Sequence, residues 1–371
     1  MSEIINTFPI CSEISVDLKQ KIKLFHIFDD INGFNVLFVT IDDQVYGYGQ
    51  NTDGCCGLGH TNVVKIPQLI PELCNKNIKM FFVGYAFVLA LTEDNKLFGW
   101  GRKGIGYYEK VRQIPFPKKT IVQIACGYLH ALVLTNDGSI YVWGSNQQGQ
   151  LGIGKTYKFV SDPKLMKFFS KTPIKYIHTS NMQSFAITSE GKLFTWGYND
   201  YFKPGHVMNP AERIFTPEEI AIDQVKEISS SNTNTYFLTE KGSIYFCGKA
   251  FDMFNNAIYE KTPKMIENYG NDLDYLKTYE ANHISYKSLA FSITKNTLYI
   301  LDSNRICKTK YQTPFDFISN EYKITGETIR VEQTIVNHIL VSHDKDDRQN
   351  TTLPNEEQED MEVEDEITTI T

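Results

Sequence analysis

One ten-residue phrase recurs along the chain and constrains its fold more than any other feature. It begins with Thr, continues through polar residues, and ends with apolar or aromatic residues followed by Gly. Five copies occupy residues 40–49, 92–101, 135–144, 188–197 and 239–248, and a degenerate sixth occupies 294–302. The ends of successive copies are 43 to 54 positions apart. A period near fifty residues is typical of stacked or radially arranged supersecondary units. Because repeat folds present broad surfaces, the period favours a binding protein over an enzyme.

Each repeat divides into four short apolar stretches, most clearly in the third unit. There the stretches are residues 121–126, 130–134, 139–143 and 162–166. The sequence Asn136-Asp137-Gly138 is a hairpin signal between the second and third stretches. Pro163 in the fourth stretch suits an edge strand, because proline cannot donate to a strand ladder. Four strands per unit, repeated radially, predict a β-propeller.

The units begin at seven places, which are Ile22, Ile78, Ile121, Ile174, Val225, near Leu276 and Ile329. The last unit, residues 329–341, holds only a first strand pair. Residues 8–11 (Phe-Pro-Ile-Cys) resemble the fourth stretches of other units, so we expect them to pair with the C-terminal strands and remove the open sheet edges. The predicted fold class is therefore all-β, a seven-bladed β-propeller with N- and C-terminal segments closing one blade. Residues 15–21 read as a short helical linker with Ser15 as its N-cap.

Charge is distributed very unevenly along the chain. The net charge is -7, but residues 344–371 alone carry eleven acidic and two basic side chains. We therefore divide the chain into a β-propeller, residues 1–343, and a disordered acidic tail, residues 344–371. The remainder is close to neutral, which argues against direct nucleic-acid binding, since that function needs clustered Lys and Arg.

The compartment is constrained by cysteine usage and by hydropathy. The seven cysteines are odd in number and form no Cys-x-x-Cys pair. They fit a reducing environment better than a disulfide framework. The N-terminus has no basic and apolar signal pattern, and no apolar run approaches the ~20 residues of a membrane helix. We expect a soluble protein of the cytoplasm, the nucleus or both, with no membrane contact.

The third unit carries a specific resemblance. Residues 124–134 read Ile-Ala-Cys-Gly-Tyr-Leu-His-Ala-Leu-Val-Leu, followed by Trp-Gly-Ser-Asn at 143–146 and Gly-Gln-Leu-Gly at 149–152. Residues 54–59 repeat the second pattern more loosely. These motifs resemble the regulator of chromosome condensation repeat family over roughly residues 1–343. The order of elements at the N-terminus is similar to the propeller portion of proteins that join this repeat to a BTB domain, in whose place this chain has the acidic tail.

The resemblance implies a propeller that binds protein partners. The similarity to family members with a BTB domain implies a ubiquitin-ligase component as partner. The similarity to the family's founding member implies a small GTPase as partner. In that founding member, one propeller face promotes nucleotide exchange and the other meets chromatin. In this chain the repeat has diverged: Phe87, Gln183 and Asn234 replace the His130 of the third unit. Because the repeats no longer share one set of loop residues, we do not expect the nucleotide-exchange activity in this chain.

Two sequence motifs look chemical. Residues 149–156 satisfy the P-loop expression, and 99–104 satisfy the dinucleotide expression Gly-x-Gly-x-x-Gly. Both coincide with repeat positions, and neither is followed by a helical pattern, so we interpret them as repeat loops. His130 lies inside a predicted strand pair and reads as a structural imidazole. The sequence therefore predicts no catalytic residues, no cofactor and no metal site.

We expect partner binding on the loops that follow each Trp-Gly or equivalent pair, since these loops emerge on one propeller face. Several hold bulky or basic residues where a plain turn would be polar. The candidate partner-binding residues are Arg102, Lys103, Tyr107, Tyr108, Tyr201, Phe202, Phe251 and Phe254. The alternative is that these aromatic side chains fold back onto the blades. The predicted function is a monomeric, non-enzymatic interaction scaffold or adaptor. Two alternatives stay open, which are guanine-nucleotide exchange on a Ran-like GTPase with chromatin association, and a propeller that has lost its partner.

Overall fold

The computed structural model describes residues 9–30, 33–101, 108–155, 157–199, 205, 212–222, 224–230, 234–251, 257–266, 275–280, 288–294, 297–302 and 305–308. Within these ranges the chain forms six four-stranded antiparallel sheets, each built from four consecutive strands. The strands of the third sheet fall where the four apolar stretches predicted them, and all six described sheets begin at or beside the expected unit starts.

The first sheet contains β1 (Ile22–Asp30), β2 (Gly33–Thr40), β3 (Val45–Gly49) and β4 (Val64–Leu69). The second contains β5 (Ile78–Val83), β6 (Val88–Thr92), β7 (Leu97–Gly101) and β8 (Tyr108–Ile114). The third contains β9 (Ile121–Cys126), β10 (His130–Thr135), β11 (Ile140–Ser145) and β12 (Phe159–Leu165). The fourth contains β13 (Ile174–Ser180), β14 (Gln183–Thr188), β15 (Leu193–Asn199) and β16 (Glu212–Ile220). The fifth contains β17 (Val225–Ser230), β18 (Asn234–Thr239), β19 (Ile244–Phe251) and β20 (Ala257–Ile266). The sixth contains β21 (Tyr275–Glu280), β22 (Ser288–Thr294), β23 (Thr297–Asp302) and β24 (Arg305–Lys308).

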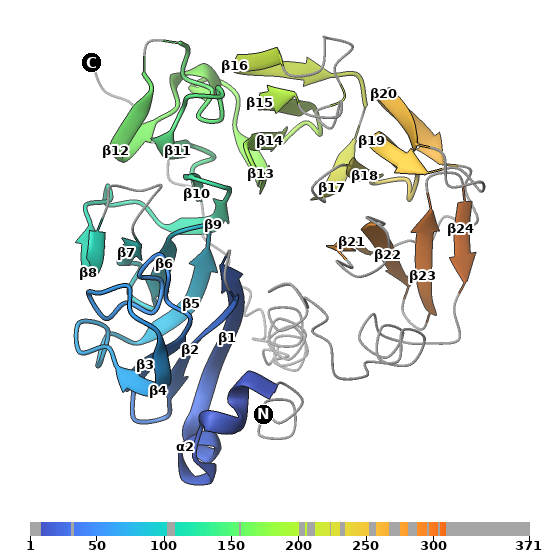
Figure 1. Ribbon diagram of the computed structural model, residues 1–371. Coiled ribbons are helices and arrows are strands. Elements are labelled where there is room, and N and C mark those ends of the chain that lie inside the picture. The colour runs from blue at the N-terminus through green and yellow to red at the C-terminus, as the bar shows by residue number, and fades with distance from the viewer. Residues whose placement is uncertain are drawn as a thin grey trace, which may run out of the picture.

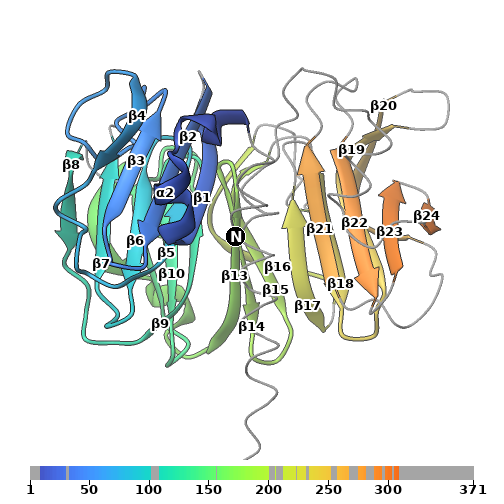
Figure 2. The same cartoon turned by 90° about the horizontal axis from the view of Figure 1, so that it is seen from below.

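The six sheets are the blades of a β-propeller. Figure 1 shows them arranged around a common axis, with the first strand of each blade innermost and the fourth outermost. In the side view of Figure 2 the strands run between the two faces of the ring. Because neighbouring strands are antiparallel, the loops from first to second strand and from third to fourth strand leave from the same face. We call this the loop face. The unit expected at 329–341 lies outside the described residues, so a seventh blade stays a prediction.

The recurring Thr phrase is the hairpin between the second and third strands of a blade. The Thr hydroxyl accepts from the N–H four residues on, at 3.1 Å for Thr40 and 2.8 Å for Thr92, and donates to the carbonyl of the same residue at 3.2 Å in both hairpins. The fourth residue of the phrase has a positive φ, 57° at Asp43 and 77° at Gly138. That conformation suits Gly, Asn or Asp, the residue types found there. The hairpin is therefore encoded locally, and its repetition sets the period of the fold.

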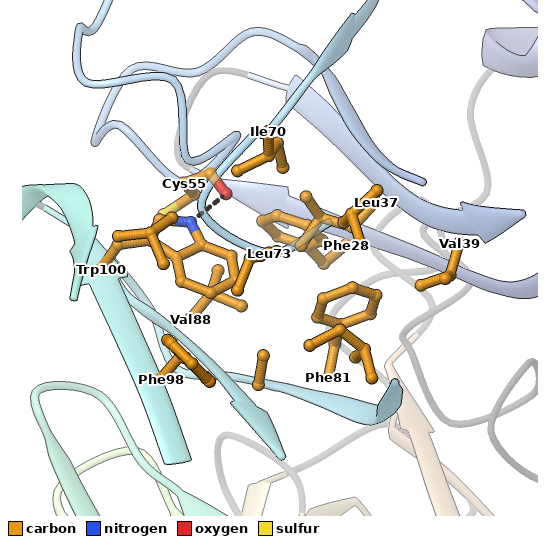
Figure 3. Close-up of a cluster of buried hydrophobic side chains, with 14 residues drawn as sticks. Phe28, Leu37, Val39, Cys55, Ile70, Leu73, Phe81, Val88, Phe98 and Trp100 are labelled. Atoms are coloured by element: carbon orange, nitrogen blue, oxygen red, sulfur yellow. Dashed lines mark hydrogen bonds between the residues drawn. The ribbon is translucent and has the colours of Figure 1, made fainter. Parts of the chain in front are cut away.

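Apolar side chains fill the space between adjacent blades. In the first of these clusters, Phe28 and Leu37 of the first blade meet Phe81, Val88 and Trp100 of the second, all nearly inaccessible to solvent. Figure 3 shows the rings of Phe81 and Trp100 facing the first blade, where they lie edge to face at 6.5 Å between centroids. Full burial of each such side chain stabilises the fold by roughly 1.5–3 kcal/mol. The blades are held together mainly by this packing.

The N-terminal segment differs in part from the prediction. Pro9–Glu13 form a 3-10 helix, η1, where a closing strand was expected. Cys11 and Ile14 are buried against the first blade, and the Tyr48 hydroxyl donates to the carbonyl oxygen of Ile10 at 3.1 Å. The proline and this anchoring explain a helical turn at this point. The short helix α2 (Val16–Lys21) is confirmed, with Ser15 as the N-cap that accepts from the N–H of Leu18. Residues 1–8 and 309–371 lie outside the described residues, so closure by both termini stays a prediction.

Candidate functional site

Two Gly-rich loops on the loop face, residues 51–59 and 146–154, are each organised by one buried asparagine. Oδ1 of Asn51 accepts from the N–H of Cys56 at 2.9 Å, and Oδ1 of Asn146 accepts from the N–H of Leu151 at 3.0 Å. Each Nδ2 donates to two further carbonyl oxygens of the same connection, at 2.8 and 3.0 Å for Asn51 and at 2.9 Å twice for Asn146. A buried backbone turn needs its polar groups satisfied, and the asparagine does so from inside the loop.

Each of these loops is also bonded to the next blade. Nε1 of Trp100 donates to the carbonyl oxygen of Cys55 at 2.8 Å, as drawn in Figure 3. Nε1 of Trp196 donates in the same way to Gln150 at 2.9 Å. We call these two sets of contacts the 1/2 junction and the 3/4 junction, after the blades that they join. The loops therefore serve as braces between blades, and the Trp of the repeat signature is their anchor.

The P-loop expression at 149–156 falls within the second brace. The residues after it form the strand β12, so no helix N-terminus faces the loop. The N–H of Gly154 donates to the carbonyl oxygen of Phe215 on the next blade at 2.9 Å, and Nζ of Lys155 lies 5.4 Å from the centroid of the Phe215 ring. A phosphate cradle needs free loop N–H groups and a helix dipole behind them. The interpretation as a repeat loop is confirmed for the part of this motif that the structure describes.

His130 belongs to the 3/4 junction. Its Nε2 lies 2.9 Å from Oγ of Ser184, and that hydroxyl donates to the carbonyl oxygen of Gln150 at 2.8 Å. Because the Ser184 proton is used on Gln150, Nε2 must be the protonated nitrogen of a neutral imidazole. Complete burial lowers the pKa of His130 to about 3. A Cβ on Gly127 would come within 2.1 Å of the imidazole, which explains the glycine at that position. His130 is a buried structural group, as predicted.

The predicted partner-binding residues lie mostly outside the described residues. These are Arg102, Lys103, Tyr107, Tyr201, Phe202 and Phe254. Tyr108 is the first residue of β8, where it pairs with Gly101, and Phe251 is the last residue of β19, where it pairs with Ala257. Both positions border third-to-fourth loops on the loop face. Strands β8 and β19 lie on opposite sides of the ring in Figure 1, so these two positions do not form one compact site. The proposed role of all eight residues stays a prediction.

A pair of aromatic side chains outside the predicted set lies nearer the propeller axis. Tyr85 and Tyr128 stand on the first-to-second loops of the second and third blades, and their rings stack with centroids 4.1 Å apart. Both side chains are half-buried. The N–H of Tyr128 donates to the carbonyl oxygen of Asn181 on the fourth blade at 2.6 Å, so three successive loops are linked. The signal was present in the sequence as the repeated Gly-Tyr at 84–85 and 127–128.

Among the residues that the structure describes, no group of His, Cys, Asp and Glu has the geometry to hold a metal ion. None of the described helices is long and apolar enough to cross a membrane. Burial raises the pKa of Cys11 to about 11 and also raises that of Cys126, so neither thiol is activated as a nucleophile.

Comparison with protein-family models identifies the repeat. Models of the regulator of chromosome condensation (RCC1) repeat match residues 42–91, 121–150 and 137–187. With the four-stranded blades and the bracing loops, these matches define an RCC1-type β-propeller. The chain therefore contains repeats of the regulator of chromosome condensation type.

Curated proteins are similar to this chain over part of their length. The chain is similar to the ultraviolet-B receptor UVR8 of Arabidopsis thaliana, with 28% identity over 62% of this chain and 55% of the relative. It is 31% identical to protein RCC1 of Candida albicans over 46% of this chain and 32% of the relative. The E3 ubiquitin-protein ligase HERC2 of Homo sapiens matches 69% of this chain at 29% identity, over 6% of its own length. The chain thus spans about half or less of the relatives it matches.

Solved structures support the fold. Human WBSCR16 superposes with a TM-score of 0.61 at 20% identity, covering 76% of this chain and 77% of that one. Prp20p of Saccharomyces cerevisiae superposes with a TM-score of 0.59 at 20% identity, covering 82% and 78%. At this level of identity the likeness extends to the propeller and no further.

Proposed function

We propose that the chain is a non-enzymatic protein-interaction scaffold whose contact surface is the loop face. The observation that carries this proposal is the stacked pair of Tyr85 and Tyr128 at the inner part of that face. Half-buried, preordered aromatic side chains bind partners at low entropic cost and dominate many interfaces. The predicted residues around 102–108, 201–202 and 251–254 fall in the chain at or after the ends of β7, β15 and β19, and these strand ends lie on the same face. Together they suit one extended protein partner better than a small molecule.

The junctions support the non-enzymatic part of this proposal, because their residues have structural roles. The groups of the third blade that resemble reactive chemistry, His130 and the P-loop-like loop, are bonded into the contacts between blades. A general base must reach a substrate and titrate near the working pH. His130, fully enclosed and with a pKa of about 3, meets neither condition.

The test compares capture by three forms of the full chain. Tyr85→Ala/Tyr128→Ala is expected to lose partners that wild type retains from native cells. Ile41→Ala is the matched control, because Ile41 is 70% exposed on a second-to-third hairpin, on the opposite face. A partner that is still captured by the double variant but is lost by Ile41→Ala would contradict the proposal, because its interface would lie on the face opposite the loop face.

A second candidate function is guanine-nucleotide exchange on a Ran-like small GTPase, with chromatin association. It is favoured by the relative named RCC1 and by Prp20p, whose structure was described with its binding properties to Gsp1p and histones. Against it stands the divergence of the loops between blades, since exchange needs groups of defined chemistry on one face. We expect catalytic amounts of the purified chain to leave release of a fluorescent nucleotide from Ran at its spontaneous rate. Clear acceleration would make this second function the correct one.

A further inference from the structure

The outer edge of the third blade is strongly basic. Between residues 154 and 171 the chain has five lysines and a single acidic residue, Asp162. The lysines are Lys155, Lys158, Lys164, Lys167 and Lys171, all exposed except the half-buried Lys164. They lie on and beside β12, the outermost strand of this blade in Figure 1. We call these five residues the basic rim.

The basic rim is not neutralised by neighbouring acidic groups. Oδ1 of Asp162 lies 3.6 Å from the Arg112 guanidinium on β8, so the one local carboxylate already has a partner. Within the described part of the chain, none of the five lysines forms an ion pair. Lysines elsewhere do: Lys23 lies 3.1 Å from Asp43, and Lys175 lies 3.3 Å from Glu240. The rim is therefore a concentration of unpaired positive charge.

Apolar side chains are exposed among these lysines. Tyr157, Phe159, Leu165 and Phe168 are between 40% and 50% exposed. Nζ of Lys164 stands 3.5 Å from the centroid of the Tyr157 ring, and its hydrogen bond lowers the pKa of that tyrosine. The corresponding strand of the fourth blade, β16, carries Glu212, Glu218 and Glu219 with one arginine. The basic and aromatic edge of the third blade is thus absent from the fourth blade and is not a consequence of the fold alone.

We propose that the basic rim binds the acidic tail of the same chain, residues 344–371. The tail carries eleven acidic and two basic side chains, which complements the rim in sign. The tail also contains apolar residues among and after its carboxylates, which are Met361, Val363 and Ile367. These side chains suit contact with the exposed aromatic side chains of the rim. The contact is electrostatic and apolar together, and it requires no folded structure in the tail.

Because the acidic tail is tethered to the propeller, its binding to the basic rim is favoured. A tail of 28 residues extends up to ~90 Å, whereas a compact body of 343 residues has a radius of gyration of only ~20 Å. The tail therefore reaches any point of the propeller edge. A flexible tether gives an effective concentration in the millimolar range, so weak individual ion pairs suffice. A nucleic acid, in contrast, meets a chain with a net charge of -7 and must displace the tail.

Zero-length carbodiimide crosslinking of the dilute full chain tests the proposal, because it joins carboxylates to amines that are in contact. Mass spectrometry is expected to find tail carboxylates joined mainly to the basic rim, within one chain. The yield is expected to fall in high salt, which shortens the Debye length to about 3 Å at 1 M. The internal control is a second set of exposed lysines, which are Lys65 on the first blade, Lys76 between the first two blades and Lys79 on the second blade. Crosslinks spread evenly over both lysine sets, or joining two chains, would overturn the proposal.

A second measurement uses substitutions in the full chain. Lys158→Gln/Lys167→Gln/Lys171→Gln is expected to speed cleavage of the tail by a Glu-specific protease about threefold or more. Lys65→Gln/Lys76→Gln/Lys79→Gln, which changes net charge equally, is expected to leave the rate at the wild-type value. Equal rates in all three forms would refute the contact. Binding of a DNA duplex to the rim with the tail in place would also refute it and would identify a polyanion as the ligand.

Discussion

The junctions between blades and the loop face differ in what their residues resemble and in what they do. The 3/4 junction holds a histidine, a serine and a P-loop-like sequence, the residue types of an active site. His130 and Ser184 are buried and lie within hydrogen-bonding distance across the blades, and the P-loop-like sequence is bonded to the next blade through the N–H of Gly154. The loop face presents two tyrosines, which carry no catalytic chemistry but are partly accessible and preordered. In a repeat protein, accessibility therefore separates binding residues from structural ones better than residue type does.

The two junctions also differ from each other. At the position of Ser184 in the fourth blade, the second blade has Val88, so this one position is apolar in the 1/2 junction and polar in the 3/4 junction. Both keep the Asn-centred loop and the Trp hydrogen bond. The brace is the constant part of the repeat, and the rest of each junction tolerates exchange of polar for apolar groups of suitable volume.

The largest expected effect is that of Trp196→Ala. This substitution leaves a cavity in the cluster around Leu151 and Phe169 and removes the hydrogen bond to Gln150. We expect the free energy of unfolding to fall by about 3–5 kcal/mol. Trp196→Phe keeps most of the ring volume and is expected to cost about 1 kcal/mol, the value of one hydrogen bond. Chemical denaturation measures both, and equal losses would show that the ring volume contributes nothing to the brace.

Acid should weaken the 3/4 junction through His130. The pKa of this residue falls from an unfolded value near 6.5 to about 3 in the folded state, so the unfolded chain binds the extra proton. Its contribution to stability is therefore complete above pH 6.5 and is lost as the pH falls towards 3. The slope approaches about 1.4 kcal/mol per pH unit. His130→Gln, which copies the Gln183 of the next blade, is expected to abolish this component. Parallel pH profiles of wild type and variant would refute the assignment.

The smallest expected effect is that of Lys155→Ala. The side chain is exposed and rests over the Phe215 ring, so its loss should change stability by less than about 0.5 kcal/mol. We expect neither wild type nor variant to bind ATP or GTP in calorimetry. Nucleotide affinity in wild type that disappears in the variant would restore the P-loop interpretation.

The period of the Thr phrase predicted the blades because the hairpin it encodes is local. Thr40, Asp43 and their counterparts determine each turn through bonds within five residues. The conversion of 9–13 into a helical turn depends on packing against Tyr48, a contact 38 residues away that no local pattern contains. The RCC1 signature predicted which residues recur, but only the structure shows that Trp196 reaches back to the preceding blade.

The candidate surface was predicted only in part. Bulky loop residues such as Tyr108 and Phe251 were noticed because they depart from turn composition. Tyr85 and Tyr128 were missed because each looks like an ordinary repeat residue. Their stacking depends on the radial placement of two blades, which brings together loops 43 residues apart. The basic rim was missed for a similar reason. The sequence shows five nearby lysines, but only the structure shows that they lie on and beside β12, at the outer edge of the blade.

The most direct test of the separation between junction and loop face measures stability and partner affinity on the same proteins. A partner captured by wild type is purified and titrated into Tyr85→Ala/Tyr128→Ala and into Trp196→Phe. We expect the tyrosine variant to lose affinity by about tenfold or more while its melting temperature stays close to that of wild type. We expect Trp196→Phe to lower the melting temperature and leave the affinity unchanged. Loss of affinity in Trp196→Phe with full affinity in the tyrosine variant would contradict the account.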